Sequence, residues 1–101
     1  MKFHFLHENF NVLDLEKSIK FYDEALGLKV VREKFAEDGS YKIVYLGDGV
    51  THFQLELTWL ADRTEKYDLG DEEFHLAFEV DNYDEAFKKH TDMGCVVFVN
   101  E

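Results

Sequence analysis

Two histidines and one glutamate in this sequence have the types and positions needed to bind one metal ion: His7, Glu56 and His75. Each lies in a strand-like segment in which large apolar residues occupy alternate positions. Because successive side chains of a strand point to opposite faces, these three should lie on the polar faces of their strands. Two imidazoles and one carboxylate, with water in the remaining positions, suit a divalent first-row transition metal. A substrate oxygen could bind at an open position and be polarised by the ion.

Strand parity alone also permits a second interpretation of the same residues. Polar side chains on the outer face of an antiparallel strand are commonly solvated and nothing more, so each of His7, Glu56 and His75 could be a surface residue. The single cysteine, Cys95, excludes a disulfide framework and a cysteine-based zinc site. We expect it to pack as a small apolar residue, and we assign no chemistry to the other three histidines.

The first half of the chain has the pattern of a strand, a helix and three more strands. Its aromatic and apolar residues predict a strand over 3–12. Apolar residues then recur at spacings of three and four, which predicts a helix that Asp14 caps and Gly27 ends. The strands that follow, separated by turn signals rich in Asp and Gly, are predicted at 28–35, 41–46 and 51–60.

The second half repeats this pattern in part. Residues 60–73 are polar and acidic without a sustained period, and we interpret them as a connection. Residues 74–80 have the pattern of a strand, and Asp81 and Gly94 have the positions of an N-cap and of the end of a helix. A last strand is predicted over 95–101.

The repeat relates the chemically interesting residues to one another. At one common offset, His7 and Phe10 align with His75 and Phe78, which indicates an internal duplication with the two histidines at equivalent positions. We therefore divide the chain into a first module at 1–59, a connecting segment at 60–73 and a partial second module at 74–101.

Composition and charge exclude several classes of protein. The chain of 101 residues is 46% apolar, which is too apolar for intrinsic disorder. Its net charge of −11 argues against binding to nucleic acid or to an anionic membrane, since both attract clustered Lys and Arg. No apolar run approaches the roughly 20 residues of a bilayer span, and residues 1–10 lack the features of a secretory signal. We expect a cytoplasmic protein with neither of these partners.

Several segments of the sequence together match a known family. They are Phe5-Leu6-His7, the run from Asp14 to Tyr22, Leu26-Gly27-Leu28, Leu55-Glu56-Leu57-Thr58, Lys66-Tyr67-Asp68-Leu69-Gly70 and His75-Leu76-Ala77-Phe78-Glu79-Val80. With these residues the sequence resembles glyoxalase I (lactoylglutathione lyase) and the wider vicinal oxygen chelate superfamily, along essentially its whole length.

The resemblance implies an α+β fold of paired βαβββ modules, with the second module incomplete at its C-terminus. It implies a lyase with a small-molecule substrate, the hemithioacetal of methylglyoxal and glutathione, which becomes lactoylglutathione. The family's metal ligands are His, Glu, His and Glu, and the first three fall on His7, Glu56 and His75. Glu56 is also the catalytic residue that the resemblance implies, as the base that moves a proton between two substrate carbons.

The resemblance also sets expectations for cofactor and assembly. Nickel or cobalt is favoured as the divalent ion because the chain is short, with zinc possible, and a homodimer is expected. The family's fourth ligand would fall beyond Glu101, so we expect the natural polypeptide to continue for roughly 20 to 30 residues, enough for two strands. The family's glutathione-contacting Arg and Asn fall on Asn11 and Leu60, which leaves glutathione open as the co-substrate.

Three other functions remain open on the same resemblance. A ring-cleaving dioxygenase would use Fe(II) with two histidines and one carboxylate, although its Glu usually comes from a last strand that this sequence lacks. A drug-sequestering protein of the bleomycin-resistance type would use the cleft between modules without a metal. The chain could also be an inactive fragment.

Overall fold

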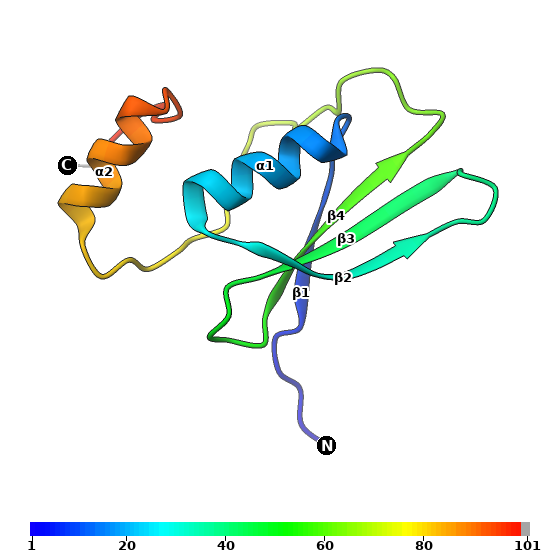
Figure 1. The fold of residues 1–101 in the computed structure, drawn as a ribbon, viewed down its shortest axis with the longest axis horizontal. Coiled ribbons are helices and arrows are strands. Elements are labelled where there is room, and N and C mark those ends of the chain that lie inside the picture. The colour runs from blue at the N-terminus through cyan, green and yellow to red at the C-terminus, as the bar shows by residue number, and fades with distance from the viewer. Residues whose placement is uncertain (100–101) are drawn as a thin grey trace. The chain divides into compact units, whose positions relative to one another are not determined.

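The structure of this chain, a computed structural model, describes residues 1–99 (Figure 1). Its elements are β1 (His7–Asn11), α1 (Leu15–Leu26), β2 (Lys29–Phe35), β3 (Tyr41–Gly47), β4 (Gln54–Leu60) and α2 (Tyr83–Asp92). The chain divides into two compact units, which we call unit 1 (Met1–Asp68) and unit 2 (Leu69–Glu101). Neither helix in residues 1–99 has the length and apolar character that a bilayer-spanning helix requires.

Unit 1 is built around one mixed sheet with the strand order β1-β4-β3-β2. β1 runs parallel to β4, whereas β3 is antiparallel to both β4 and β2. The βαβββ pattern predicted for the first half is confirmed, with β1 shorter than the predicted 3–12. Because the first strand pairs with the last, segments that lie far apart in the sequence become neighbours, and this pairing positions the site described below.

Helix α1 contacts β2 and β4 and covers one face of the sheet (Figure 1). Asp14 accepts a hydrogen bond from the backbone N–H of Lys17 at 3.1 Å. Gly27 adopts a φ of +69°, and its N–H donates to the carbonyl of Asp23 at 2.9 Å, so both predicted limits of the helix are confirmed. The buried aliphatic residues of unit 1 are Leu15, Ala25, Leu28, Val44, Leu46, Leu55 and Leu57. Burial of each leucine stabilises the fold by about 1.5–3 kcal/mol.

The predicted turns between the antiparallel strands are also confirmed. Gly39 and Gly49 have φ values of +77° and +78°, which glycine adopts without steric cost. Asp48 caps the turn between β3 and β4, because its Oδ1 accepts from the backbone N–H groups of Val50 and Thr51, both at 2.8 Å. These local bonds order the turn that joins β3 to β4.

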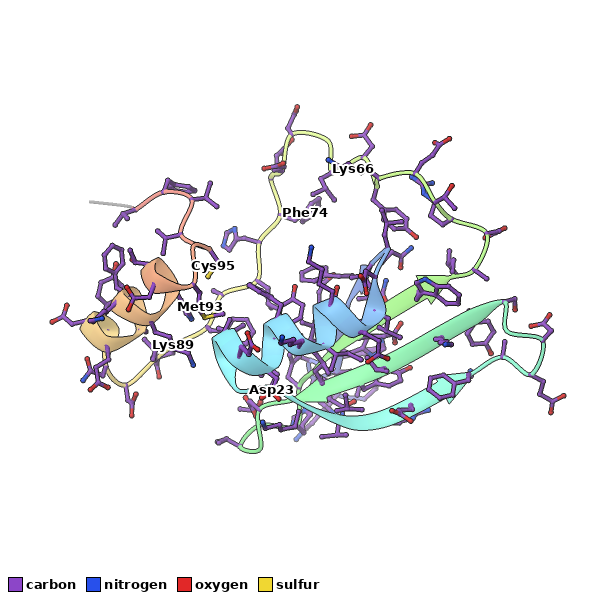
Figure 2. All side chains as sticks on the ribbon, turned by 45° about the horizontal axis from the view of Figure 1, so that its top comes forward. Asp23, Lys66, Phe74, Lys89, Met93 and Cys95 are labelled. Carbon is purple, nitrogen blue, oxygen red and sulfur yellow. The ribbon has the colours of Figure 1, made fainter. Side chains whose placement is uncertain are left out.

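Unit 2 contains the predicted helix, α2, with one correction at its start. Asn82, and not Asp81, is the N-cap: its side chain accepts from the backbone N–H of Glu85 at 3.1 Å. Gly94 takes a φ of +74° just after the helix, as predicted. Figure 2 shows the side chains of this unit; Cys95 is half-buried, with its Sγ 3.4 Å from the carbonyl of His90.

The two strands predicted for unit 2 are wrong for the described residues. Residues 74–80 and 95–99 form no strand, and residues 100–101 of the second prediction lie outside the described part of the chain. A strand requires a neighbouring strand that forms hydrogen bonds with its backbone N–H and C=O groups. No segment within residues 1–99 pairs with either of these two. Alternating side chains alone were therefore not sufficient to form a strand.

Candidate metal centre

The pairing of β1 with β4 gathers polar side chains on the sheet face opposite α1, which we call the open face. The parallel register pairs His7 with Gln54, Asn9 with Glu56 and Asn11 with Thr58. Leu55 and Leu57 are 3% and 0% exposed in the core, so Glu56, which lies between them, points to the open face. Glu56 and His7, which contacts it, therefore lie on the polar faces predicted for them.

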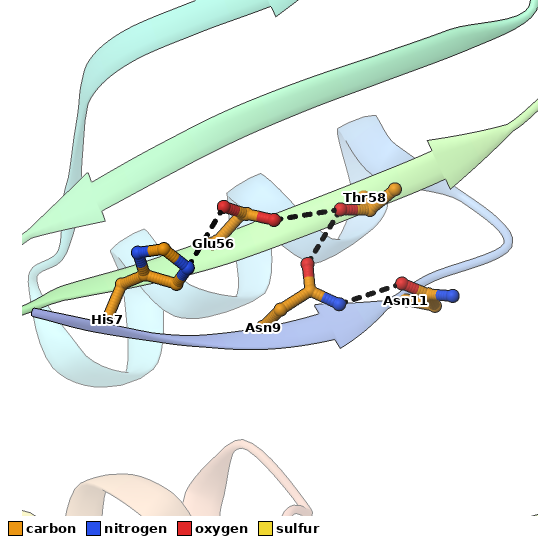
Figure 3. Close-up of polar contacts among 5 residues, drawn as sticks. All are labelled: His7, Asn9, Asn11, Glu56 and Thr58. Carbon is orange, nitrogen blue, oxygen red and sulfur yellow. Dashed lines mark hydrogen bonds and ion pairs between the residues drawn. The ribbon is translucent and has the colours of Figure 1, made fainter.

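His7 and Glu56 face each other across the two strands (Figure 3). Nε2 of His7 lies 3.4 Å from Oε2 of Glu56, and the two side chains are 37% and 14% exposed. Two atoms that each bind one ion at about 2.1 Å lie about 3.0–3.4 Å apart at octahedral or tetrahedral angles. The donor types and their separation therefore fit two neighbouring ligands of one divalent ion.

Glu56 also contacts two neighbours that can donate a hydrogen bond to it. Oγ1 of Thr58 lies 3.3 Å from Oε1 of Glu56. A hydrogen bond to Glu56, and then burial, raises the pKa of Tyr45, while the nearby Arg32 cation partly opposes the rise. Tyr45 is 9% exposed, so a neutral phenol adjoins the carboxylate and its O–H can donate to it.

Aromatic and cationic groups extend the open face from Glu56 towards β2. The ring of Tyr45 meets the ring of His7 edge to face, with centroids 6.0 Å apart. The guanidinium carbon of Arg32 lies 4.8 Å from the centroid of the Tyr45 ring. The cross-strand register places Tyr45 between Arg32 and Glu56. The open face thus combines nitrogen and oxygen donors on β1 and β4 with a cation on β2.

Tyr45 was not predicted as a neighbour of the site. Tyr45 lies between Val44 and Leu46 in β3, and both of these are 1% exposed, so alternation could have placed Tyr45 on the polar face. Its contact with Glu56 depends on β3 pairing with β4 in one particular register. That register was not readable from either strand alone.

The third predicted ligand, His75, belongs to unit 2 and is not among the residues that β1 and β4 bring together. Within residues 1–99, no three His, Cys, Asp or Glu side chains are gathered as a metal site. Unit 1 brings His7 and Glu56 together, and the roles of His7, Glu56 and His75 as metal ligands stay predictions.

Curated relatives match most of this chain. A "Lactoylglutathione lyase" of Neisseria meningitidis is 41% identical over 91 residues, covering 88% of this chain and 65% of the relative. One from Escherichia coli O157:H7 is 38% identical over 93 residues, covering 88% of this chain and 67% of the relative. The chain therefore spans about two thirds of the length of these relatives.

Solved structures agree with this similarity. The trypanothione-dependent glyoxalase I of Leishmania major superimposes with a TM-score of 0.76 at 31% identity, covering 92% of this chain and 68% of that one. Glyoxalase I from Zea mays gives a TM-score of 0.51 at 44% identity, over 58% of this chain and 22% of that one. The first of these supports the α+β fold over most of the chain.

A family model covers nearly every residue discussed above. It describes the Glyoxalase/Bleomycin resistance protein/Dioxygenase superfamily and matches residues 4–99. The matched segment includes both members of the His7–Glu56 pair and the whole βαβββ sheet of unit 1. The fold agrees with the family model, and the chain belongs to the Glyoxalase/Bleomycin resistance protein/Dioxygenase superfamily.

Proposed function

We propose that this protein is a metal-dependent lyase of the glyoxalase I type, which converts the hemithioacetal of methylglyoxal and a thiol into the lactoyl thioester. The observation that carries the proposal is the approach of His7 Nε2 to Glu56 Oε2, 3.4 Å apart on the open face. Two bacterial relatives named lactoylglutathione lyase, 41% and 38% identical to this chain, support the same reaction.

The residues on the open face have separate roles in this reaction, which are metal binding and proton transfer. His7 would hold the ion through a neutral nitrogen, and Glu56 through a carboxylate oxygen. A divalent ion, when bound, supplies a positive charge that favours negative charge on the substrate oxygens. Glu56 accepts the proton from the carbon that bears the sulfur and returns it to the neighbouring carbon. The reaction is an isomerisation, so no other reactant is consumed.

The finer parts of the proposal rest on the resemblance to the family. We propose His75 as the third ligand, and nickel or cobalt as the preferred ion over zinc. We also propose a homodimer in the cytoplasm, and the division into modules at 1–59 and 74–101 joined by 60–73. The alignment of His7 with His75 in the internal repeat supports the ligand assignment.

The identity of the thiol is a separate part of the proposal. Asn11 and Leu60 stand where the family has groups that hold glutathione, and neither residue can pair with a carboxylate as Arg does. The Leishmania major neighbour is described as trypanothione-dependent, so thiols differ among these proteins. We propose that glutathione hemithioacetal is turned over poorly here. Steady-state KM values equal to those of a family member that has both groups would contradict this.

Metal analysis combined with one matched pair of variants tests the proposed activity. Glu56→Gln keeps the shape of the side chain but removes its charge and its basicity. We expect metal-dependent turnover to fall by at least about 100-fold, because general base catalysis contributes about 10²–10⁴-fold. Glu33→Gln is the control, since Glu33 lies in the same sheet but opposite the buried Val44 rather than on the open face. Full metal content and turnover in the Glu56 variant would contradict the proposal.

A further inference from the structure

Three uncharged polar side chains continue from Glu56 along the open face, and we call Thr58, Asn9 and Asn11 the polar row (Figure 3). Oγ1 of Thr58 lies 2.6 Å from Oδ1 of Asn9 and 3.3 Å from Oε1 of Glu56. Nδ2 of Asn9 donates to Oδ1 of Asn11 at 2.8 Å. The two oxygens of Glu56 therefore face different partners: Oε1 faces Thr58, and Oε2 faces His7.

The polar row can direct its hydrogen bonds towards or away from Glu56. The Thr58 hydroxyl has one proton and lies near two acceptors. At 2.6 Å, Asn9 is the closer acceptor, whereas the distance of 3.3 Å to Glu56 is long for a hydroxyl donor. The amide nitrogen of Asn9 is turned to Asn11, so its oxygen faces Thr58.

Rotation of the two amides reverses this direction without moving either strand. Asn11 then donates to Asn9, Asn9 donates to Thr58, and the Thr58 proton is left for Glu56. A charged acceptor attracts a shorter and stronger hydrogen bond than a neutral one. Negative charge on Glu56 therefore favours the direction in which the whole row donates towards it.

We infer that Thr58, supported by Asn9 and Asn11, is a positioning residue that holds one oxygen of Glu56 while the other is presented beside His7. The inference rests on the proposed function, since it concerns the same carboxylate. A carboxylate held at one oxygen loses fewer orientations when the other binds an ion. Partners that orient ligating groups in this way commonly change metal affinity or activity by 10–100-fold.

The test compares Thr58→Val with Thr58→Ser in the full-length protein. Valine keeps the shape and the branching of threonine but has no hydroxyl, whereas serine keeps the hydroxyl. We expect Thr58→Val to bind Ni²⁺ about 10- to 100-fold more weakly by calorimetry and to lose kcat with little change in KM. Thr58→Ser should stay within about threefold of the unmodified protein, because the donor is retained.

A matched control separates this role from the general effect of losing a threonine hydroxyl. Thr51 lies outside the open face, and its Oγ1 donates to Asp48 at 2.8 Å. We expect Thr51→Val to change thermal stability but to leave the affinity for Ni²⁺ unchanged. Circular dichroism should show that each variant is folded.

The outcomes separate this inference from the proposed function. Equal Ni²⁺ affinity in Thr58→Val and the unmodified protein would overturn the inference while the lyase proposal stands. Affinity that depends on Thr58, without hemithioacetal turnover, would support the inference and overturn the lyase proposal. A protein that binds no divalent metal would overturn both.

Discussion

The two helices of this protein begin alike but have different surroundings. Asp14 and Asn82 have nearly the same backbone angles, φ −129° and ψ 96° against φ −136° and ψ 95°. Each side chain accepts a hydrogen bond at 3.1 Å from the backbone N–H three residues further along. α1 then buries Leu15 and Ala25, whereas α2 has no buried residue within the described part of the chain.

The strand-like segments of the two units show the same contrast. Residues 54–60 and 74–80 both have large apolar side chains at alternate positions. The first segment pairs with β1 and β3 and forms β4, while the second forms no strand among residues 1–99. Helix caps need only neighbours in sequence, but strands and buried side chains need partners from distant segments. Local similarity between the two units therefore did not produce similar tertiary structure.

The largest difference between the units should appear in stability. Leu57 is 0% exposed in unit 1, whereas Phe87, on α2, is 39% exposed. We expect Leu57→Ala to lower the free energy of unfolding by about 2–5 kcal/mol, through lost burial and the cavity left behind. Phe87→Ala should lower it much less, because Phe87 is only partly buried. Urea unfolding monitored by circular dichroism measures both, and equal losses would contradict the comparison.

The two histidines aligned by the repeat, His7 and His75, should be equivalent in function if both units contribute to the site. If His7 and His75 are both metal ligands, alanine at either position should weaken Ni²⁺ binding to a similar extent. We expect a loss of roughly 100-fold or more, since loss of even an outer partner of a ligand costs about 10–100-fold. Calorimetric titration measures the affinity, with His90→Ala as the control on α2. An effect confined to His7→Ala would remove His75 from the site.

A smaller effect is expected at the two helix caps, where the units are most alike. Replacement of either cap by alanine removes one hydrogen bond to a backbone N–H and should cost about 0.5–2 kcal/mol of helix stability. Asp14→Ala should lower the midpoint of global unfolding, because α1 packs on the sheet. Asn82→Ala should instead increase hydrogen exchange within α2. A shift in global stability from Asn82→Ala as large as that from Asp14→Ala would show that α2 also contributes to a shared core.

The smallest effect concerns pH and the turn between β3 and β4. Hydrogen bonds from Val50 and Thr51 hold the pKa of the Asp48 carboxyl below its usual value. A lowered folded-state pKa means that the stabilisation is complete above the unfolded-state pKa of about 3.9 and is lost as pH falls through the lower folded-state value. Asp48→Asn removes this titration. The thermal midpoint of the variant should therefore fall less between pH 5 and about pH 2.5, and an unchanged acid profile would exclude the role.

Much of unit 1 was predictable because its signals are local or periodic. Asp14 and Gly27 marked the limits of α1 through capping chemistry. Gly39 and Gly49 marked the turns, because each has the positive φ that glycine tolerates. Alternation placed Glu56 between two core leucines, and hence on the open face, since side chains of a strand alternate in direction.

The contacts around Glu56 were not predictable in the same way. His7 and Asn9 on β1 and Tyr45 on β3 lie beside it, and their positions depend on the strand order and on the register of each pair. A shift of one residue in either register would turn the facing side chains to the opposite side of the sheet. The strand predicted at 74–80 was wrong for a related reason, because a strand depends on a pairing partner as well as on its own residues.

The sequence by itself therefore determined the limits of α1, the turns of unit 1, and the type and parity of His7 and Glu56, since these depend on residues a few positions apart. The tertiary structure decided that His7 and Glu56 meet at 3.4 Å and that the polar row adjoins them. The physical reason is the parallel pairing of β1 with β4. This pairing joins two segments that are far apart in the chain and become neighbours only in the folded sheet.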